Sequence, residues 1–377
     1  TLGPGGYALT VTSGSSETGN DFGNFRQGTK SGMKFNDLNG NGAKDAGEPG
    51  LPGWTINAYV DGNGNGQLDA GETTIAASAT TAPVTGAYTL TLNPGSYVVC
   101  EVLQSGWFES QPANTNCVAG TGLGPGGYAL TVTSGSSDTG NDFGNFQKGS
   151  KSGVKYNDLN GNGAKDVGEP GLPGWTINAY VDANGNGMLD AGETTVATSA
   201  VTDGVGAYSL SLNPGKYIIC EVQQAPWTQS EPANTKCGAS SGGYAVTVTS
   251  GSTESGNNFG NFQKGTKSGV KFNDLNGNGV KDMGEPGLSG WEIRAYKDLD
   301  GDGTLSVAEA AVGPASSMTT NGSGAYSFSL NPGKYVICEV LQSGWFESRP
   351  ANVKCAGGSG FSLGPGGYAL TVTSGSS

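Results

Sequence analysis

Six stretches of this sequence place acidic and amide side chains at regular intervals. In the first, "DLNGNGAKDAGE" at residues 37–48, such side chains stand at positions 1, 3, 5, 9 and 12, and Gly42 stands at position 6. This is the spacing of the twelve-residue EF-hand calcium loop. Calcium takes about 6–8 oxygen ligands, and a loop that curls around the ion supplies them from alternate residues. The spacing predicts six calcium sites.

The predicted ligands stand at positions 1, 3, 5, 7, 9 and 12 of each loop, with position 7 acting through its backbone carbonyl. They are Asp37, Asn39, Asn41, Ala43, Asp45 and Glu48; Asp61, Asn63, Asn65, Gln67, Asp69 and Glu72; Asp158, Asn160, Asn162, Ala164, Asp166 and Glu169; Asp182, Asn184, Asn186, Met188, Asp190 and Glu193; Asp274, Asn276, Asn278, Val280, Asp282 and Glu285; and Asp298, Asp300, Asp302, Thr304, Ser306 and Glu309. The alternative is a set of solvated turns, because Asn-Gly pairs also mark tight turns.

The segments that flank these loops are not those of an EF-hand. Pro-Gly follows Glu48, Glu169 and Glu285, where the second helix of an EF-hand would continue. Proline inside a helix removes a hydrogen bond and clashes with the preceding turn. The loops are therefore expected to join strands. Only "LSVAEAAV", residues 305–312, can form a short helical turn.

The acidity of the chain is concentrated in these loops. The chain has 32 acidic and 19 basic residues, a net charge of −13, and no histidine. The six loops hold 19 of the acids. An acidic chain without a run of Lys or Arg does not favour nucleic acid as a partner. No apolar stretch is long enough to span a membrane.

The six cysteines recur at one spacing. Each repeat carries two of them, 17 residues apart, and the pairs are Cys100 with Cys117, Cys220 with Cys237, and Cys338 with Cys355. One pair per repeat predicts three disulfides and an oxidising compartment. The alternative is buried free thiols.

The chain is a tandem repeat. "KSG" recurs at residues 30, 151 and 267, and "LNPG" recurs at residues 92, 212 and 330. We expect residues 1–25 to be the closing strand of a preceding repeat. Residues 26–147, 148–263 and 264–377 then form three repeats with two calcium loops each, and the third lacks its closing segment.

The local patterns are those of strands throughout. Tyr88, Leu90 and Leu92 alternate with threonines, which is typical of a half-buried strand, and residues 98–100 indicate a strand buried on both faces. Several short strands with turn signals in each repeat predict an all-β protein of three tandem antiparallel sandwiches.

The loop followed by "EPGL", the second strand and "GAYTLTLNPGSY" resemble the calcium-binding B repeats of serine–aspartate repeat adhesins. They also resemble collagen-adhesin B-type domains. This resemblance implies Ig-like or prealbumin-like sandwiches in an extracellular stalk or surface filament of a prokaryotic cell, made rigid by calcium. Residues 1–377 include no serine–aspartate tract, wall-sorting tail or ligand-binding head.

The resemblance also implies a candidate Lys–Asn isopeptide bond, which is assisted by a buried acid in collagen-adhesin domains. The candidate residues are Lys34, Lys155 and Lys271, Asn145 and Asn261, and the acids Glu101, Glu221 and Glu339. The alternation of the first strand argues against the bond, because Met33 and Phe35 fit the core face and turn Lys34 outward. A solvated lysine is the alternative.

Other function classes have less support. An enzyme lacks the usual general base, because the chain has no histidine. A carbohydrate-binding or host-binding adhesin module is the alternative class, with glycans or other surface proteins as partners. Its stacking residues would be Trp54, Trp107, Phe108, Trp175, Trp227, Trp291, Trp345 and Phe346. The competing interpretation places these aromatic residues in the core or at domain junctions.

The first residues repeat a later segment. "LGPGGYALTVTSGSS" occurs at residues 2–16, 123–137 and 363–377. In the first two places it leads into "TGNDFGNF". An orphan strand exposes backbone groups that pair with a sheet edge. We therefore expect residues 1–25 to complete a domain outside this chain, in a neighbouring copy or further upstream, which predicts a head-to-tail filament. A tail that packs on residues 30–147, or stays free in solvent, is the alternative.

Overall fold

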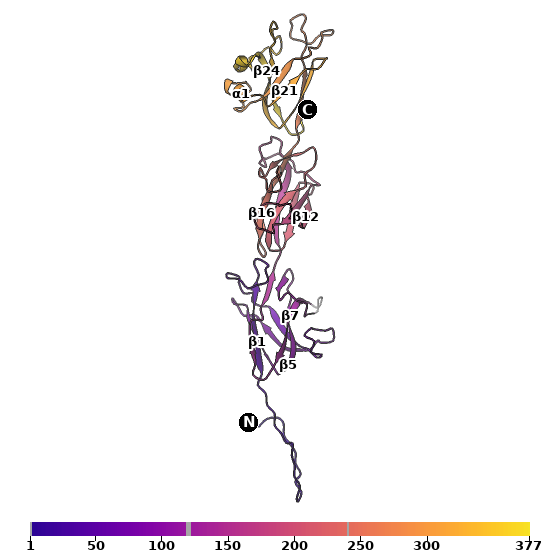
Figure 1. Ribbon diagram of the computed structural model, residues 1–377, viewed down its shortest axis with the longest axis vertical. Helices are drawn as coiled ribbons and strands as arrows, with labels where there is room; N and C mark the ends of the chain where they lie inside the picture. The colour runs from indigo at the N-terminus through magenta and orange to yellow at the C-terminus, as the bar shows by residue number, and fades with distance from the viewer. Residues whose placement is uncertain (1, 118–121, 240) are drawn as a thin grey trace. The chain divides into compact units, whose positions relative to one another are not determined.

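The computed structural model describes residues 2–117, 122–239 and 241–377. These residues are almost entirely β-structure, and each repeat forms its own sheets (Figure 1). Two compact units are distinguished: one holds the chain up to residue 148 with residues 249–251, and the other holds the remainder. The predicted all-β fold with tandem sandwiches is confirmed.

The first repeat folds into two sheets, with the strand orders β3-β2-β5-β7 and β4-β1-β9-β6. Its strands are β1 (Gly28–Asn36), β2 (Thr55–Val60), β3 (Ile75–Thr80), β4 (Ala87–Leu92), β5 (Gly95–Val102), β6 (Phe108–Gln111), β7 (Leu123–Val132), β8 (Ser137–Asp138) and β9 (Phe143–Phe146).

The second repeat has the same arrangement, with the orders β12-β11-β14-β16 and β13-β10-β18-β15. Its strands are β10 (Gly149–Asn157), β11 (Thr176–Val181), β12 (Val196–Val201), β13 (Ala207–Leu212), β14 (Gly215–Glu221), β15 (Thr228–Glu231), β16 (Gly243–Val248), β17 (Thr253–Glu254) and β18 (Phe259–Phe262).

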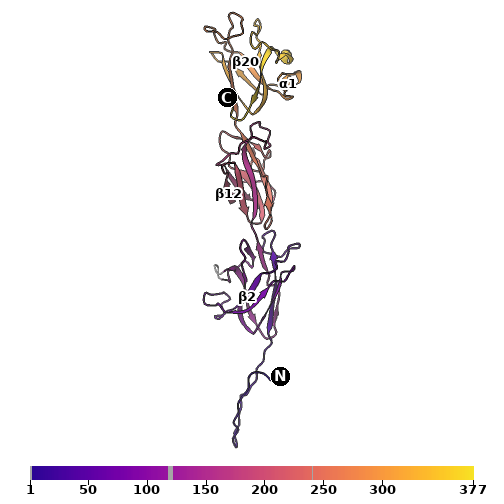
Figure 2. The same ribbon diagram turned by 180° about the vertical axis from the view of Figure 1, so that it is seen from behind.

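The third repeat has one complete sheet, β21-β20-β23-β24, and a two-stranded sheet, β19-β22. Figure 2 shows β20 together with β2, which holds the corresponding place in the first repeat, and with β12 of the second repeat, which corresponds to β21. Its elements are β19 (Gly265–Val270), β20 (Glu292–Lys297), α1 (Val307–Val312), β21 (Ser316–Thr319), β22 (Ala325–Leu330), β23 (Gly333–Val340), the 3₁₀ helix η1 (Ala356–Phe361) and β24 (Leu363–Val372).

The core of each sandwich lies between its two sheets. In the first repeat, the alternate residues Tyr88, Leu90 and Leu92 of β4 are buried against Val99 and Phe143. The alternation of β4 and the double-sided burial of residues 98–100 agree with the sequence pattern. The short helix α1 also lies where the sequence predicted a helical turn.

Two pairings in each of the first two repeats depart from an all-antiparallel sandwich. The short strands β8 and β17 run parallel to β1 and β10, respectively. The last strand of the first repeat, β9, runs parallel to the first strand, β1, with Lys34 opposite Phe143 and Asn36 opposite Asn145. The second repeat pairs β10 with β18 in the same way. The strand that closes each of these repeats therefore lies beside the strand that opens it.

The residues before β1 join no sheet. Tyr7, Leu9 and Val11 are at least half exposed, and residues 2–25 do not pack on the sheets of the first repeat. The expected completion of a domain outside the chain stays a prediction. A tail free in solvent is its alternative, and the oligomeric state of the chain decides between them.

Candidate functional sites

Each predicted calcium loop closes on the side chains of its first and last positions. In the first loop the buried Asp37 carboxylate accepts backbone N–H groups from Gly40 and Gly42 at 2.7 and 2.8 Å. Glu48 accepts the N–H groups of Leu38 and Asp45 at 2.8 and 2.9 Å. The two carboxylates thus fix both ends of the loop in place.

The side chains at positions 3, 5 and 9 meet at one point of the loop. The amide groups of Asn39 and Asn41 both donate to the same oxygen of Asp45, each at 2.8 Å. The four loops of the same sequence type, at residues 61–72, 158–169, 182–193 and 274–285, repeat this contact at 2.7–2.9 Å. Each convergence turns two amide N–H groups toward one carboxylate, and in the first loop the amide oxygens of Asn39 and Asn41 accept backbone N–H groups at 2.9 and 2.7 Å. Carboxylate and amide oxygens are the types of ligand that calcium takes.

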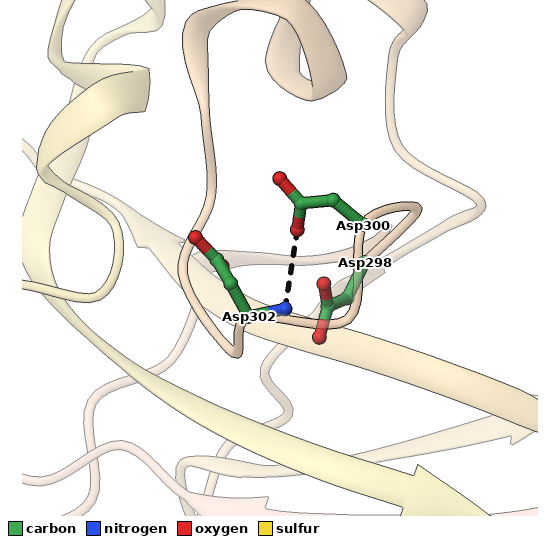
Figure 3. A group of neighbouring side chains, drawn as sticks. All are labelled: Asp298, Asp300 and Asp302. Atoms are coloured by element: carbon green, nitrogen blue, oxygen red, sulfur yellow. Dashed lines mark hydrogen bonds between the residues drawn. The ribbon is translucent and has the colours of Figure 1, made fainter.

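The sixth loop brings three carboxylates together (Figure 3). Oxygens of Asp298, Asp300 and Asp302 all lie within 4.8 Å of one another. Figure 3 shows the backbone N–H of Asp302 donating to Asp300, at 3.1 Å. Ionised carboxylates cannot donate hydrogen bonds to one another, so these three negative charges repel each other at short range. A bound cation would reduce this repulsion. The donor set fits a hard divalent cation.

The last two predicted ligands of the sixth loop have a second structural role. Ser306 caps α1: its hydroxyl accepts the N–H of Glu309 at 3.2 Å and donates to the Glu309 carboxylate at 3.0 Å. Glu309 also accepts the N–H of Leu299 at 2.6 Å. This capping box explains why a helical turn follows this loop alone among the six.

Lys34 is fully buried, so the expectation that it points outward was wrong. Its ammonium group contacts Asn145 and Glu101 and lies 4.2 Å from the centre of a Trp54 ring. Phe35 is also fully buried. Alternation failed here because both faces of β1 are covered at this point, so that neighbouring residues are both enclosed.

The Glu101 carboxylate contacts both partners. One oxygen contacts Lys34, and the other accepts the side-chain N–H of Asn145 at 2.7 Å. The same arrangement occurs in the second repeat, where Lys155 lies 2.7 Å from one oxygen of Glu221 and contacts Asn261. Asn261 in turn donates to the other oxygen of Glu221 at 2.8 Å.

Burial favours the neutral forms of this pair. Removal from water lowers the pKa of Lys34 to about 8 and raises the pKa of Glu101, although each partner opposes the shift of the other. The pKa of Lys155 is likewise lowered to about 8, and that of Glu221 is raised. A lysine that gives up its proton more readily is a better nucleophile, and the group that it touches is an amide.

The third repeat holds the lysine and the acid alone. Lys271 lies 2.6 Å from Glu339 and 4.3 Å from the centre of a Trp291 ring. Its side chain is 15% exposed, whereas the side chains of Lys34 and Lys155 are at 0%. Within the described residues no asparagine side chain is hydrogen-bonded to this pair.

Sequence inspection missed a second acid near the first of these sites. Glu109 on β6 accepts the N–H of Gly126 at 2.7 Å, and burial followed by the nearby Glu101 charge raises its pKa to about 8. The second repeat carries Gln229 there, which accepts the N–H of Gly242 at 2.9 Å. A comparison of "FESQ" at residues 108–111 with "TQSE" at residues 228–231 shows that Glu and Gln exchange at this position, and this exchange is the signal that could have identified it.

The three predicted disulfides are confirmed. Cys100 pairs with Cys117, Cys220 with Cys237, and Cys338 with Cys355. In the first repeat the pair packs with Leu68, Val98 and Leu123 on the outer face of the sheet that contains β5. Each disulfide closes a loop of 17 residues, a constraint of about 3 kcal/mol in the chain-entropy model.

The aromatic residues belong mostly to the protein's own packing. Trp54, Trp175 and Trp291 are 2–3% exposed and cannot stack on a ligand, which corrects their place among candidate stacking residues. Trp107, Trp227 and Trp345 pack edge-on against these three rings, and Phe108 stacks on Phe146. Phe346 is 92% exposed.

No protein-family model and no curated protein matches the chain. The solved structures to which the chain is similar include the Bacillus anthracis TIE protein, with 16% identity, 93% of this chain and 49% of that chain covered, and a TM-score of 0.29. They also include a streptococcal ancillary pilin (12% identity, 93% of this chain and 96% of that chain, TM-score 0.26) and the major pilin subunit of Bacillus cereus (12% identity, 85% and 90%, TM-score 0.29). This chain spans about half the length of the TIE protein. Structural similarities with TM-scores this low do not support an inference of function. The function is therefore inferred from the residues of this chain alone.

No helix in the described ranges is long and apolar enough to cross a membrane.

Proposed function

We propose that this chain is a non-catalytic structural repeat protein of an extracellular filament or cell-surface stalk. Calcium and disulfides make it rigid, and copies assemble head to tail. The site that supports a structural role most directly is the buried Lys–Glu–Asn set of the first two repeats. Buried, cross-linked sandwiches in tandem suit a protein that carries tension outside the cell, where disulfides persist.

The Lys–Glu–Asn set joins the two ends of a repeat. Lys34 lies on β1, where the chain enters the first repeat, and Asn145 lies on β9, where it leaves. An amide bond between these two side chains would transmit a pulling force directly from β1 to β9. The other strands of the sandwich would then not bear that force. The link would also span 111 residues, worth about 4.7 kcal/mol in the chain-entropy model for a loop of that order.

The contacts fit a direct amide exchange. The neutral Lys34 amine attacks the side-chain carbonyl carbon of Asn145, a C–N bond forms, and the original C–N bond breaks to release ammonia. Glu101 contacts both nitrogens, so it can take the proton from the amine and give it to the departing nitrogen. Lys155, Glu221 and Asn261 are placed for the same exchange in the second repeat.

Calcium would be held by the loop residues named from the sequence. The convergence of positions 3, 5 and 9, and the three carboxylates of the sixth loop, support this proposal. When bound, the ion supplies a fixed positive charge that offsets the loop carboxylates. Extracellular modules of this type bind calcium at about 10⁻⁴–10⁻³ M.

The test combines intact mass with single-molecule pulling. We expect the wild-type mass to be lower than the sequence mass by two ammonia molecules, beyond the loss from three disulfides. The Lys34→Ala/Lys155→Ala variant should lose that difference. Under force, the 111 residues between Lys34 and Asn145, less the 17 held by the disulfide, would extend by about 31–34 nm in the variant.

The third repeat provides an internal control in the pulling experiment. It should unfold once in both proteins, whereas extension of the first two repeats should appear only in the variant. A wild-type chain that extends three times, with no ammonia lost, would refute the role of the Lys–Glu–Asn set.

A further inference from the structure

Eleven asparagines of this chain are followed directly by glycine, and this dipeptide has a reaction of its own. The backbone nitrogen of the glycine gives up its proton and attacks the side-chain carbonyl carbon of the asparagine. A new C–N bond closes a succinimide ring, the bond to the side-chain nitrogen breaks, and ammonia leaves with the proton. Water then opens the ring to aspartate or isoaspartate. Glycine favours this deamidation because it has no side chain to hinder ring closure.

Ten of these Asn–Gly pairs lie in the predicted calcium loops, and the eleventh is Asn321 with Gly322. The ten occupy positions 3–4 and 5–6 of the first five loops, and the sixth loop has Asp–Gly in both places. The loop pairs and the Asn321 pair differ in the group that reacts first, which is the backbone N–H of the glycine.

In the loops this N–H is held by the aspartate at position 1. In the fourth loop the Gly185 N–H donates to one oxygen of Asp182 at 2.7 Å, and the Gly187 N–H donates to the other oxygen at 3.1 Å. The first, second and third loops have the same two hydrogen bonds at 2.6–2.9 Å. In the fifth loop Asp274 accepts from the two corresponding glycines. A nitrogen that donates its proton to a carboxylate loses that proton less readily.

The side chains of the loop asparagines are fixed as well. The side-chain N–H groups of Asn184 and Asn186 donate to Asp190 at 2.7 and 2.8 Å. The side-chain oxygen of each asparagine accepts the backbone N–H two residues further on, at 2.9 and 2.7 Å. Both ends of each amide are therefore held, and ammonia can leave only after the bond to Asp190 breaks.

Asn321 has a different arrangement in the turn between β21 and β22, where its side chain is exposed. Within the described residues, neither the Gly322 backbone N–H nor the side-chain N–H groups of Asn321 have a hydrogen-bond acceptor. The Asn321 side-chain oxygen accepts the backbone N–H groups of Ser323 and Ala325, both at 3.0 Å, and the Ser323 hydroxyl at 2.8 Å. Negative charge that develops on this oxygen during the attack is therefore already stabilised.

The second repeat shows that aspartate, one product of the reaction, fits this turn. Asp203 holds the place of Asn321, and its carboxylate accepts the backbone N–H groups of Val205 and Ala207 at 3.0 and 2.8 Å. The two turns also share their backbone hydrogen bonds, from residue 203 to 207 and from 206 to 203, and from 321 to 325 and from 324 to 321. Conversion of Asn321 to aspartate therefore keeps the contacts of the turn.

We propose that Asn321 is a site of spontaneous deamidation in the folded chain, and that the aspartate at position 1 protects the Asn–Gly pairs of the calcium loops from the same reaction. Isoaspartate adds a carbon to the backbone, which would shift the later positions of a loop, so this protection preserves the loop spacing. The inference needs neither bound calcium nor the Lys–Asn link.

The test follows deamidation site by site in the whole chain, by peptide mapping during incubation in mildly alkaline buffer. A chelator is present, so that bound calcium gives no protection. In the wild-type chain Asn321 should convert at least about tenfold faster than any loop asparagine, because its glycine N–H has no carboxylate to hold it. Gly322→Ala should slow the conversion, and this variant should fold because a Cβ there meets no atom within 4 Å. Asn321→Asp provides the reference for the aspartate product.

A second variant, Asp182→Asn, tests the protection. It keeps the size of the side chain but replaces one accepting oxygen with a nitrogen that cannot accept, so at least one glycine N–H is released. Conversion at Asn184 or Asn186 should rise at least about tenfold. Asn160 and Asn162 lie in the other loop of the same repeat and should keep their wild-type rates.

Three results would overturn the proposal. The first is a wild-type chain in which Asn321 converts no faster than the loop asparagines. The second is an Asp182→Asn chain in which Asn184 and Asn186 keep their wild-type rates. The third is an Asp182→Asn chain in which Asn160 and Asn162 accelerate equally, because the protection would then come from the fold of the repeat and not from Asp182.

Discussion

At the scale of single residues, the unusual feature is that each repeat encloses a lysine with a carboxylate. A buried ion pair is weak support for stability, because desolvation of both charges offsets their attraction. Lys34 and Glu101 are both fully buried beside Asn145, and the Lys34 ammonium group lies 4.2 Å from the centre of a Trp54 ring. The arrangement is easier to explain if it serves the formation of a cross-link.

Glu109 provides a prediction on pH. Its pKa in the folded chain is about 8, against an ordinary value of 4.5, so between these values the folded state holds a proton that the unfolded state has released. Its contribution to stability is therefore full below pH 4.5 and is lost as the pH rises through 8. We expect Glu109→Gln to fold, because the second repeat has Gln229 in the equivalent place.

The measurement is the melting temperature of both proteins from pH 4 to pH 9. The wild-type value minus the Glu109→Gln value should fall steadily across that range. A difference that stays constant with pH would show that Glu109 does not hold its proton in the folded state.

At the scale of elements, the calcium loops connect strands that the sandwich already positions. Glycine at position 6 has a role here: Gly42 has φ of +74°, a conformation that favours glycine, and it lets the loop turn back toward Asp37. Since the loops need no flanking helix, the strands alone supply their anchors.

The sixth loop provides a prediction on the melting temperature, in which removing charge has different effects without calcium and with calcium. Asp300→Asn/Asp302→Asn restores the side chains of the other five loops at these positions and removes two of the three clustered charges. Without calcium the variant should melt at a higher temperature than wild type, because each like-charge pair at about 4 Å costs about 1 kcal/mol even in water. Calcium should raise its melting temperature by less than that of wild type.

Calorimetry with calcium and with a chelator measures both effects. At a calcium concentration one hundred times the dissociation constant, one linked site stabilises by about 2.7 kcal/mol. If wild-type melting were the same in both conditions, calcium binding at these loops would be disproved.

At the scale of the whole molecule, the residues that the structure describes close the three repeats to different extents. The first two have a closing strand beside the opening one, and the third has a cavity there. Stability is therefore expected to vary along the chain, because regions with fewer buried contacts open more easily.

Hydrogen exchange should reveal this difference in dilute, monomeric protein. We expect backbone amides of residues 265–272 to exchange faster than those of residues 28–35 and 149–156. The central strands β5, β14 and β23 are paired on both sides in all three repeats and serve as the control, with similar exchange expected for each. Equal protection of the three opening strands would mean that the cavity does not weaken the third repeat.

The sequence by itself determined the features whose causes are local. Residue spacing was enough for the disulfide pairs, for the strand alternation of Tyr88, Leu90 and Leu92, and for the turn at residues 307–312. The loop spacing also predicted the convergence of Asn39, Asn41 and Asp45, although calcium itself stays a prediction.

Only the tertiary structure decided the features that depend on distant segments. Lys34 was expected to face solvent because alternation treats a strand as having one covered face. Its environment is set by Glu101 and Asn145, and the latter lies 111 residues further along the chain. The parallel pairing of β1 with β9 covers the second face. Among the described residues no strand pairs in this way with residues 271–273, and there one oxygen of Glu339 has no hydrogen-bond partner. Long-range strand pairing, which spacing along the chain does not encode, therefore decided where the lysine, glutamate and asparagine side chains meet.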